Sequence, residues 1–313
     1  MDQTQHSDGF SLRKLVFQLG WRENLAAIQY HVFTLWLFTV NDLKTMIFPS
    51  MAFALFNCLG NAQSHIAISI FIMRLPYILL WTWVNLLAFV VNNQRHPTSV
   101  IEDRLNKPWR PIPTGRISPQ NARILGHIAY PIAVAVSLLV GGGLPQCCIL
   151  AALGYIYNNP SGYNRSFFVS GALEVAMQPS NTSRSVLLDN EFVVWLSLIG
   201  AVVLSTVHSQ DLYDQEGDAA AGRRTVPLVV GDKAARWSIS LGVAFWSVLV
   251  SHYWHSAPAG YMLTMALGIC VTIRTMLLRS VGKDSVTFRI YNVWLISIYS
   301  LPVTASYHLN SLS

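Results

Sequence analysis

Apolar stretches recur along the whole of this 313-residue chain, and most of them are long. A helix that crosses a bilayer needs roughly 20 consecutive, mainly apolar residues, so the pattern indicates a chain that crosses a membrane many times. The composition agrees, because 52% of the residues are hydrophobic and 12% are charged, whereas soluble domains carry about 25% charged residues. We therefore expect an all-α, multi-pass transmembrane helix bundle.

The apolar stretches predict about nine transmembrane helices after a polar N-terminal segment. Residues 1–42 form that segment, and residues 43–313 form one transmembrane domain. The stretch 66–91 contains Arg74 and Pro76, which predicts a kinked helix with Arg74 beside a cavity or a polar partner. The predicted spans are 43–60, 66–91, 122–141, 143–158, 164–181, 191–209, 236–252, 258–278 and 287–307.

The basic residues test this number of spans. With nine spans, nearly all of the 21 Lys and Arg residues fall on the side of the N-terminus; Arg74 lies within a span, and Arg184 lies on the far side. Basic residues favour the cytoplasmic side, so we expect the N-terminus there, in the endoplasmic reticulum membrane. The weak fifth span carries Glu174, which we expect to face the bundle interior. Membrane topology thus explains the net charge of +6, and we expect no nucleic-acid partner.

One acidic patch follows the sixth span, in the sequence QDLYDQEGDAAAGRRTVP at 210–227. If the helix continues, Asp211, Asp214 and Asp218 lie on one stripe, because they are spaced i, i+3 and i+7. Stacked like charges destabilise a helix unless a cation lies against them. Mg²⁺ prefers oxygen ligands, so this stripe predicts a magnesium site.

A second charged patch, EDRLNKPWRPIPTGR at 102–116, follows the second span, which ends at Asn92 and Asn93. Acidic and basic residues alternate in it. That pattern suits a metal–diphosphate complex, because acids hold Mg²⁺ and bases hold phosphate oxygens. Pro108, Pro111 and Pro113 stiffen the loop. Both patches follow even-numbered spans, so we expect them on the cytoplasmic face, where they form two halves of one site.

The two patches resemble known motifs. DLYDQEGDAAAGRRTVPLVVGD resembles the second aspartate motif of the UbiA superfamily of intramembrane prenyltransferases, DxxDxxxD with a Gly-Arg-Thr-Pro-Gly tail. EDRLNKPWRPIPTGRIS resembles the end of that superfamily's first motif. The likeness extends over residues 43–307 and implies a UbiA-like bundle that binds Mg²⁺ and a prenyl diphosphate within the lipid bilayer.

The resemblance, together with the charge pattern, gives a set of expected site residues. The expected metal ligands are Asn93, Glu102, Asp103, Asp211, Asp214 and Asp218, with Asn93 preferred to Asn92. The residues expected to contact the diphosphate are Lys44, Arg104, Lys107, Arg110, Tyr157, Arg165 and Arg223.

The first motif also departs from the superfamily pattern, which usually reads NDxxDxxxD. If Asp103 is its last position, Ser99 stands where the middle aspartate belongs, and Arg95 and His96 replace the opening pair. An Asn-Gln followed at a distance by Glu-Asp is similar to the fungal membrane-bound terpene cyclases of this superfamily. It is less similar to prenyltransferases that alkylate aromatic acceptors.

Three functions are therefore considered. The leading hypothesis is a Mg²⁺-dependent terpene cyclase that ionises a linear prenyl diphosphate, such as farnesyl diphosphate, and cyclises the cation. The alternative is a prenyltransferase with a separate acceptor. A cation transporter is the weakest hypothesis, because transporter carboxylates are expected near the bilayer midplane.

His208 precedes Asp211 by three residues and lies on its helical face. Two roles stay open for it. It is either a base for a final deprotonation or a hydrogen-bonded residue that supports the site.

Overall fold

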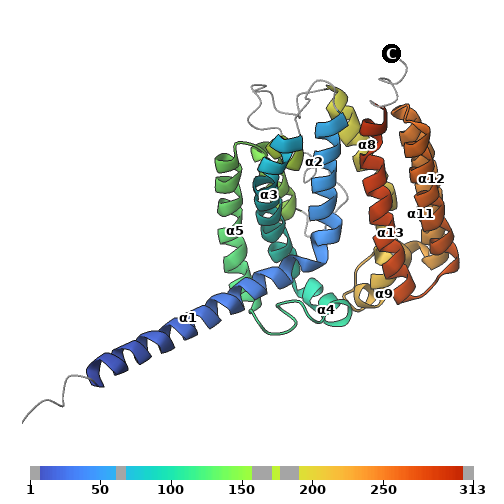
Figure 1. The fold of residues 1–313 in the computed structure, drawn as a ribbon. Helices are drawn as coiled ribbons and strands as arrows, with labels where there is room; N and C mark the ends of the chain where they lie inside the picture. The colour runs from blue at the N-terminus through green and yellow to red at the C-terminus, as the bar shows by residue number, and fades with distance from the viewer. Residues whose placement is uncertain (1–7, 61–67, 157–170, 177–189, 306–313) are drawn as a thin grey trace, which may run out of the picture.

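The structure is a computed structural model that describes residues 8–60, 68–156, 171–176 and 190–305 (Figure 1). The described elements are all helical, and none of them is a strand. The main helices stand side by side, and a long N-terminal helix projects from one end of the bundle (Figure 1). The predicted all-α bundle is therefore confirmed.

The helices follow one another with short connections. Those before residue 157 are α1 (Asp8–Thr39), α2 (Phe48–Gly60), α3 (Ile68–Gln94), α4 (Pro97–Asn106), α5 (Pro119–Val140) and α6 (Leu144–Ile156). Those after it are α8 (Asn190–Thr206), α9 (Asp211–Ala220), α10 (Val226–Val230), α11 (Asp232–Tyr253), α12 (Pro258–Leu277) and α13 (Val281–Tyr299).

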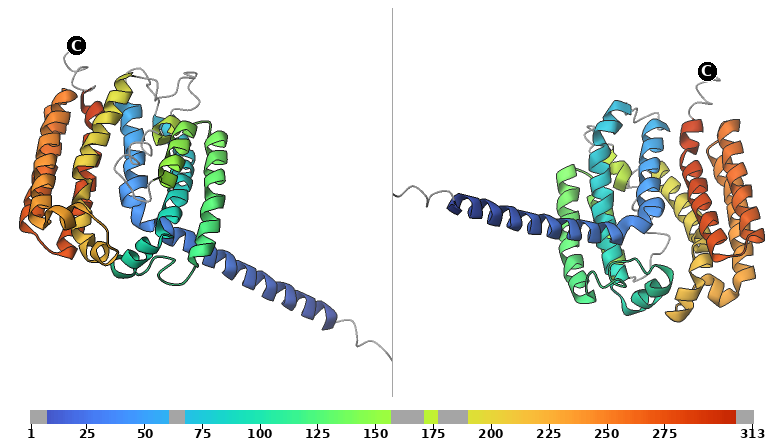
Figure 2. Two further views of the ribbon diagram at one scale, coloured as in Figure 1. Left: turned by 180° about the vertical axis from the view of Figure 1, so that it is seen from behind. Right: turned by 60° about the horizontal axis from the view of Figure 1, so that its bottom comes forward.

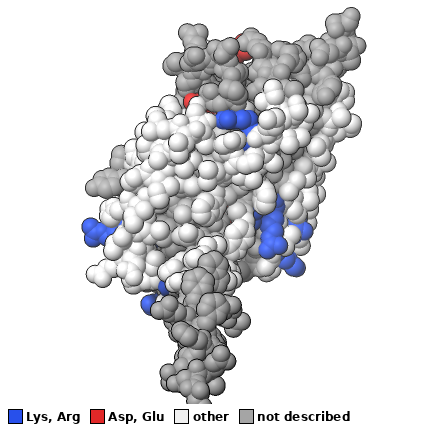
Figure 3. Space-filling view, turned by 60° about the vertical axis from the view of Figure 1, so that its left-hand side comes forward, with Lys and Arg blue, Asp and Glu red and all other residues white. Residues whose placement is uncertain are grey.

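Six helical stretches among the described residues are long and apolar enough to cross a membrane. They are Glu23–Gly60, Ile68–Gln94, Pro119–Val140, Asn190–Ser209, Asp232–Tyr253 and Pro258–Leu277. One face of the molecule carries a broad uncharged band, with most of the visible Lys and Arg below it (Figure 3). The predicted spans 143–158 and 287–307 correspond to the shorter α6 and to α13. Most of the predicted span 164–181 lies outside the described residues.

The first span begins earlier than the sequence pattern predicted. Helix α1 occupies most of the N-terminal segment, and the membrane-length stretch starts at Glu23 instead of residue 43. The reason is the apolar run 32–40, which continues into the predicted span. A 3₁₀ turn, η1 (Val40–Asp42), and a π-helical turn, η2 (Leu43–Ile47), then connect α1 to α2. Such irregular turns often occur at functional sites.

Arg74 has the polar partners that its position in a span requires. Its guanidinium donates to the carbonyl oxygens of Val140 and Val175 at 2.8–3.1 Å. Glu174 accepts a hydrogen bond from Gln146 Nε2 at 2.9 Å. These contacts connect α3, α5, α6 and residues 171–176, so the charged groups within the bundle also hold it together.

A second buried network fixes the helices behind α9. Arg236 on α11 forms a bidentate pair with Asp284 on α13, with both N–O distances 2.8 Å. It also donates to Asp232 at 2.8 Å and to the Thr275 carbonyl oxygen at 2.9 Å. Bidentate Arg–carboxylate pairs combine strength with a fixed geometry. The start of α13 is therefore anchored beside α9.

Helices α4 and α9 lie next to each other at one end of the bundle (Figures 1 and 2). Gly217 of α9 packs so closely on Asn106 of α4 that an added Cβ would lie 2.3 Å from Asn106 Nδ2. That nitrogen donates to the Asp214 carbonyl oxygen at 2.9 Å. The two charged patches, more than one hundred residues apart in sequence, thus meet at one end of the fold.

Candidate active site

A cavity of about 800 Å³ lies where α4 and α9 meet. Its wall also includes η1, η2, the C-terminal ends of α3 and α8, and the start of α13. Apolar side chains such as Phe89, Leu204 and Phe288 share this wall with a dense set of charged ones. The charged lining residues are Asp42, Lys44, Glu102, Lys107, Arg110, Asp211, Asp214, Glu216, Asp218, Arg223, Arg224 and Arg289.

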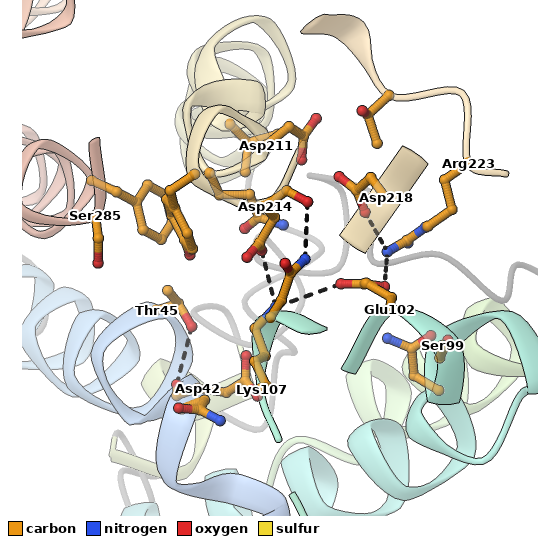
Figure 4. Close-up of a pocket in the computed structure, with 18 of the residues that line it drawn as sticks. Asp42, Thr45, Ser99, Glu102, Lys107, Asp211, Asp214, Asp218, Arg223 and Ser285 are labelled. Atoms are coloured by element: carbon orange, nitrogen blue, oxygen red, sulfur yellow. Dashed lines mark hydrogen bonds and ion pairs between the residues drawn. The ribbon is translucent and has the colours of Figure 1, made fainter. Parts of the chain in front are cut away.

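Acids and bases from the two patches alternate in a series of contacts, which we call the ion-pair chain (Figure 4). It runs through Asp214, Lys107, Glu102, Arg223 and Asp218. Lys107 Nζ lies 2.9 Å from Asp214 Oδ2 and 3.5 Å from Glu102 Oε1. Arg223 contacts Glu102 and lies 3.3 Å from Asp218 Oδ1. The chain therefore joins α4 to α9 and places two bases between three acids.

The acidic face of α9 forms although α8 does not continue into it. A 3₁₀ turn, η4 (Val207–Ser209), separates the two helices, so the predicted continuous helix is wrong at this point. Asp211 begins α9, and the spacing to Asp214 and Asp218 holds within that helix. All three line the cavity. A carboxylate in the first turn of a helix is also favoured by the helix dipole.

The α9 carboxyl groups have raised pKa values, which report a site short of positive charge. Burial raises the pKa of Asp211 to about 7, and the negative charges of Asp218 and Asp214 act in the same direction. Burial and Glu102 raise the pKa of Asp218 to about 6. Burial also raises the pKa of Asp214, against the effect of Lys107. An additional cation here would stabilise the charged carboxylates.

Asp103 and Glu102 are neighbours on α4 but occupy different places. Glu102 lines the cavity, whereas Asp103 is fully buried and is not part of the wall. Asp103 Oδ1 accepts a hydrogen bond from Arg110 Nη1 at 2.7 Å, and Arg110 itself lines the cavity. Burial raises the pKa of Asp103 to about 6, although Arg110 opposes the shift. In this structure Asp103 orients Arg110.

The two candidate asparagines are also separated by the structure. Asn93 lines the cavity, and its Oδ1 is buried without a hydrogen-bond partner among the described residues. Asn92 Oδ1 instead accepts from Arg95 at 2.7 and 3.0 Å. Ser99, which stands in place of an aspartate in the motif, lies in the cavity wall. The geometry therefore agrees with the choice of Asn93.

Other predicted residues reach the cavity unequally. Lys44 lines it from η2, while Arg104 is exposed on α4 and lies outside its wall. Tyr157 and Arg165 lie outside the described residues. Arg289 of α13 lines the cavity but was not predicted as a site residue. Its position at the start of the last span, on the same side as the patches, was the sequence signal for it.

The donor set fits a hard divalent cation. Among the described residues, no three His, Cys, Asp or Glu side chains converge as a ready-made metal cluster. The cavity does bring the oxygen atoms of the three α9 aspartates and Glu102 into one wall, together with the unpartnered Asn93 Oδ1. Mg²⁺ typically takes one or two carboxylates and completes its shell with water and phosphate. A preformed cluster is therefore not required.

These features define a class of protein. Its helices are long enough to cross a membrane, and its cavity combines apolar walls with carboxylates and bases. Such a cavity suits an amphiphile with an anionic head. The chain belongs to the UbiA prenyltransferase family, whose model matches residues 47–296.

Curated relatives agree with this assignment. A fumagillin β-trans-bergamotene synthase of Aspergillus fumigatus is 28% identical, over 86% of this chain and 91% of that protein. A somaliensene A/B synthase of Streptomyces somaliensis is 26% identical, over 94% and 96%. A polyprenyl transferase of Hericium erinaceus is 28% identical, over 69% and 74%. The protein is therefore an integral membrane enzyme of a family that uses prenyl diphosphates, generally with a divalent metal ion.

Proposed function

We propose that this protein is a Mg²⁺-dependent, class I membrane terpene cyclase. It ionises a linear prenyl diphosphate such as farnesyl diphosphate, releases diphosphate and cyclises the resulting carbocation. The observation that carries the proposal is one cavity in which the ion-pair chain and apolar side chains such as Phe89 and Phe288 share a wall. The head and the tail of one prenyl diphosphate match these two surfaces.

In this proposal the carboxylates of Glu102, Asp211, Asp214 and Asp218, together with Asn93 Oδ1, hold Mg²⁺. When bound, the metal supplies positive charge that stabilises the departing diphosphate. Lys44, Lys107, Arg110 and Arg223 donate hydrogen bonds to phosphate oxygens, as charged bases do most strongly. All of these residues line the cavity.

The apolar wall has a separate task. An allylic carbocation is quenched by water, so the cavity must exclude solvent around the hydrocarbon. Phe89 and Phe288 present aromatic rings to the cavity, and the Tyr213 ring lies 5.7 Å from that of Phe288. Ring faces stabilise nearby cations electrostatically. An internal double bond then attacks the cation, which closes a ring.

A prenyltransferase with a separate acceptor is the second candidate, supported by the similarity to the polyprenyl transferase. The altered first motif, with Ser99 in place of an aspartate, favours the cyclase, and so does the similarity to two terpene synthases. Cation transport has no support in a family of enzymes.

The test is to supply the purified full-length protein with Mg²⁺ and farnesyl or geranylgeranyl diphosphate alone. Gas chromatography with mass spectrometry should detect a cyclic hydrocarbon, and diphosphate should appear in equal amount. Turnover that requires an added aromatic acceptor would assign the prenyltransferase reaction instead.

We further propose that residues 43–313 form the catalytic domain, and that the N-terminus and both motifs face the cytoplasm at the endoplasmic reticulum. Nearly all basic residues fall on that side, which supports this orientation. Membrane-impermeant labelling of single cysteines introduced at Arg104 and Glu216 tests it, because both sites must react from the cytoplasmic side. Labelling from opposite sides would remove the basis of the shared site.

A further inference from the structure

His208 is a buried, titratable group on the cavity wall that lies outside the ion-pair chain. It belongs to the η4 turn between α8 and α9 and is 9% exposed. Leu204 and Val207, both in the cavity wall, precede it in the chain, and Asp211 follows three residues later. His208 thus stands between the apolar end of α8 and the first metal-site carboxylate of the proposed function.

Its hydrogen bonds determine which ring nitrogen carries the proton. Ser238 Oγ lies 2.8 Å from His208 Nε2 and 2.8 Å from the Ala235 carbonyl oxygen. A carbonyl only accepts, so the serine hydroxyl donates its single proton to Ala235. Ser238 Oγ must then accept a hydrogen bond from Nε2–H of His208. A neutral imidazole in that tautomer carries its basic lone pair on Nδ1.

Nδ1 is in a position to use that lone pair. It has no hydrogen-bond partner among the described residues, and it is not one of the fully buried polar atoms. The ring borders the cavity, so a substrate atom has access to it. The other polar groups nearby are less suited to accept a proton: Asp211 and Asp214 are assigned to the metal, and the Tyr213 phenol is neutral at physiological pH.

We propose that His208 is the catalytic base that ends the reaction by taking a proton from the cyclised carbocation. This inference rests on the proposed cyclase function. The C–H bond beside the cationic carbon breaks, its electron pair forms the new C=C bond, and the proton passes to Nδ1. The product is a neutral hydrocarbon and an imidazolium, which returns its proton to the released diphosphate or to water.

The experiment compares His208→Gln with the wild-type protein. The glutamine amide reaches the place of Nε2 and can donate to Ser238, but it has no basic lone pair. Full-length protein with Mg²⁺ and the prenyl diphosphate is assayed for released diphosphate and for organic products. Because ionisation precedes deprotonation, diphosphate release should stay near the wild-type rate.

The wild-type hydrocarbon, measured per diphosphate released, should fall by about 100-fold in His208→Gln, which is a typical contribution of a general base. The carbon should appear as alcohols or isomeric hydrocarbons. Ser238→Ala, which frees Nε2 to lose its tautomeric preference, should shift the products in the same direction by less. A loss of stability alone lowers total turnover without changing this ratio.

An unchanged ratio in His208→Gln overturns the assignment while the cyclase function stands. If His208→Gln does not give a monodisperse protein on size exclusion, Ser238→Ala decides, and an unchanged ratio there overturns the assignment. If the wild-type protein makes no hydrocarbon from the diphosphate alone, the proposed function fails first, and the proton transfer fails with it.

Discussion

The two charged patches have similar compositions but different architectures. On α9, three carboxylates repeat at helical spacing and all line the cavity. On α4, only Glu102 lines it, while Asp103 is buried against Arg110. The α9 patch is a surface of acids, whereas the α4 patch is a scaffold that delivers bases.

This difference indicates a division of labour within the proposed site. A regular helix places acids at equal intervals and suits them to a shared cation. The loop after α4 instead carries Lys107 and Arg110, whose positions depend on tertiary partners, namely Asp214 for Lys107 and Asp103 for Arg110. Substitutions on α9 should therefore affect chemistry first, and substitutions at Asp103 should affect stability first.

The largest effect is expected from Asp214→Asn, because it removes a carboxylate from the proposed metal site and leaves Lys107 with one fewer partner. Diphosphate release should fall by about 10³-fold, as when a preorganised electrostatic group is removed. Glu23→Gln, an acid-to-amide change on exposed α1, is the matched control and should keep wild-type activity. If Asp214→Asn retains activity, α9 is not the metal-binding face.

Asp103→Asn should act mainly on stability. It leaves the Arg110 guanidinium without its 2.7 Å carboxylate partner in a buried place. Breaking one side of a buried ion pair costs about 3 kcal/mol, so denaturant unfolding in detergent should show a loss near that size. The double substitution Asp103→Asn with Arg110→Gln should recover part of it, because no unpaired charge remains. A double variant less stable than Asp103→Asn alone would contradict the orienting role.

These contrasts also explain how far the sequence could predict the molecule. Apolar run lengths were sufficient for the bundle, and the i, i+3, i+7 spacing was sufficient for the α9 face, because both depend on local helix geometry. Spacing could not decide between Glu102 and Asp103, which are adjacent and point in different directions. The choice is made by Arg110, which folds back from the following loop.

Two further differences have the same cause. The length of α1 was underestimated because the polar residues before Glu23 obscured a helix that runs from Asp8. Arg289 was not recognised as a cavity residue because only the packing of α13 beside α9 brings it there. Long-range packing, which no local pattern encodes, determined each of these outcomes.

The raised carboxyl pKa values predict a pH dependence that should be stronger for α9 than for α4. The pKa of Asp211 rises from 3.8 to about 7, so the folded state binds this proton more tightly than the unfolded chain does. The resulting stability is fully present below pH 3.8 and is lost as pH rises through about 7. The measurement is thermal unfolding with a chelator between pH 5 and 8.

Asp211→Asn should flatten that profile, because the amide does not titrate. Adding Mg²⁺ with inorganic diphosphate should also raise the unfolding temperature most at the upper end of this range, where the carboxylates are charged. A profile that Asp211→Asn leaves unchanged would show that other groups control the pH response.

The smallest effect tests the contact that holds the two patches together. Replacing a helical glycine with alanine normally stabilises a helix by about 1 kcal/mol. At Gly217, however, the three atoms nearest to a new Cβ all belong to the Asn106 side-chain amide, at 2.3–2.7 Å. Gly217→Ala should therefore displace that amide, break its hydrogen bond to the Asp214 carbonyl oxygen and cost about 1 kcal/mol of unfolding free energy. In an Asn106→Ala background the obstructing amide is gone, so the same substitution should become stabilising. Only a direct contact between α4 and α9 predicts this reversal of sign, and equal effects of Gly217→Ala in the two backgrounds would mean that the patches are held together elsewhere.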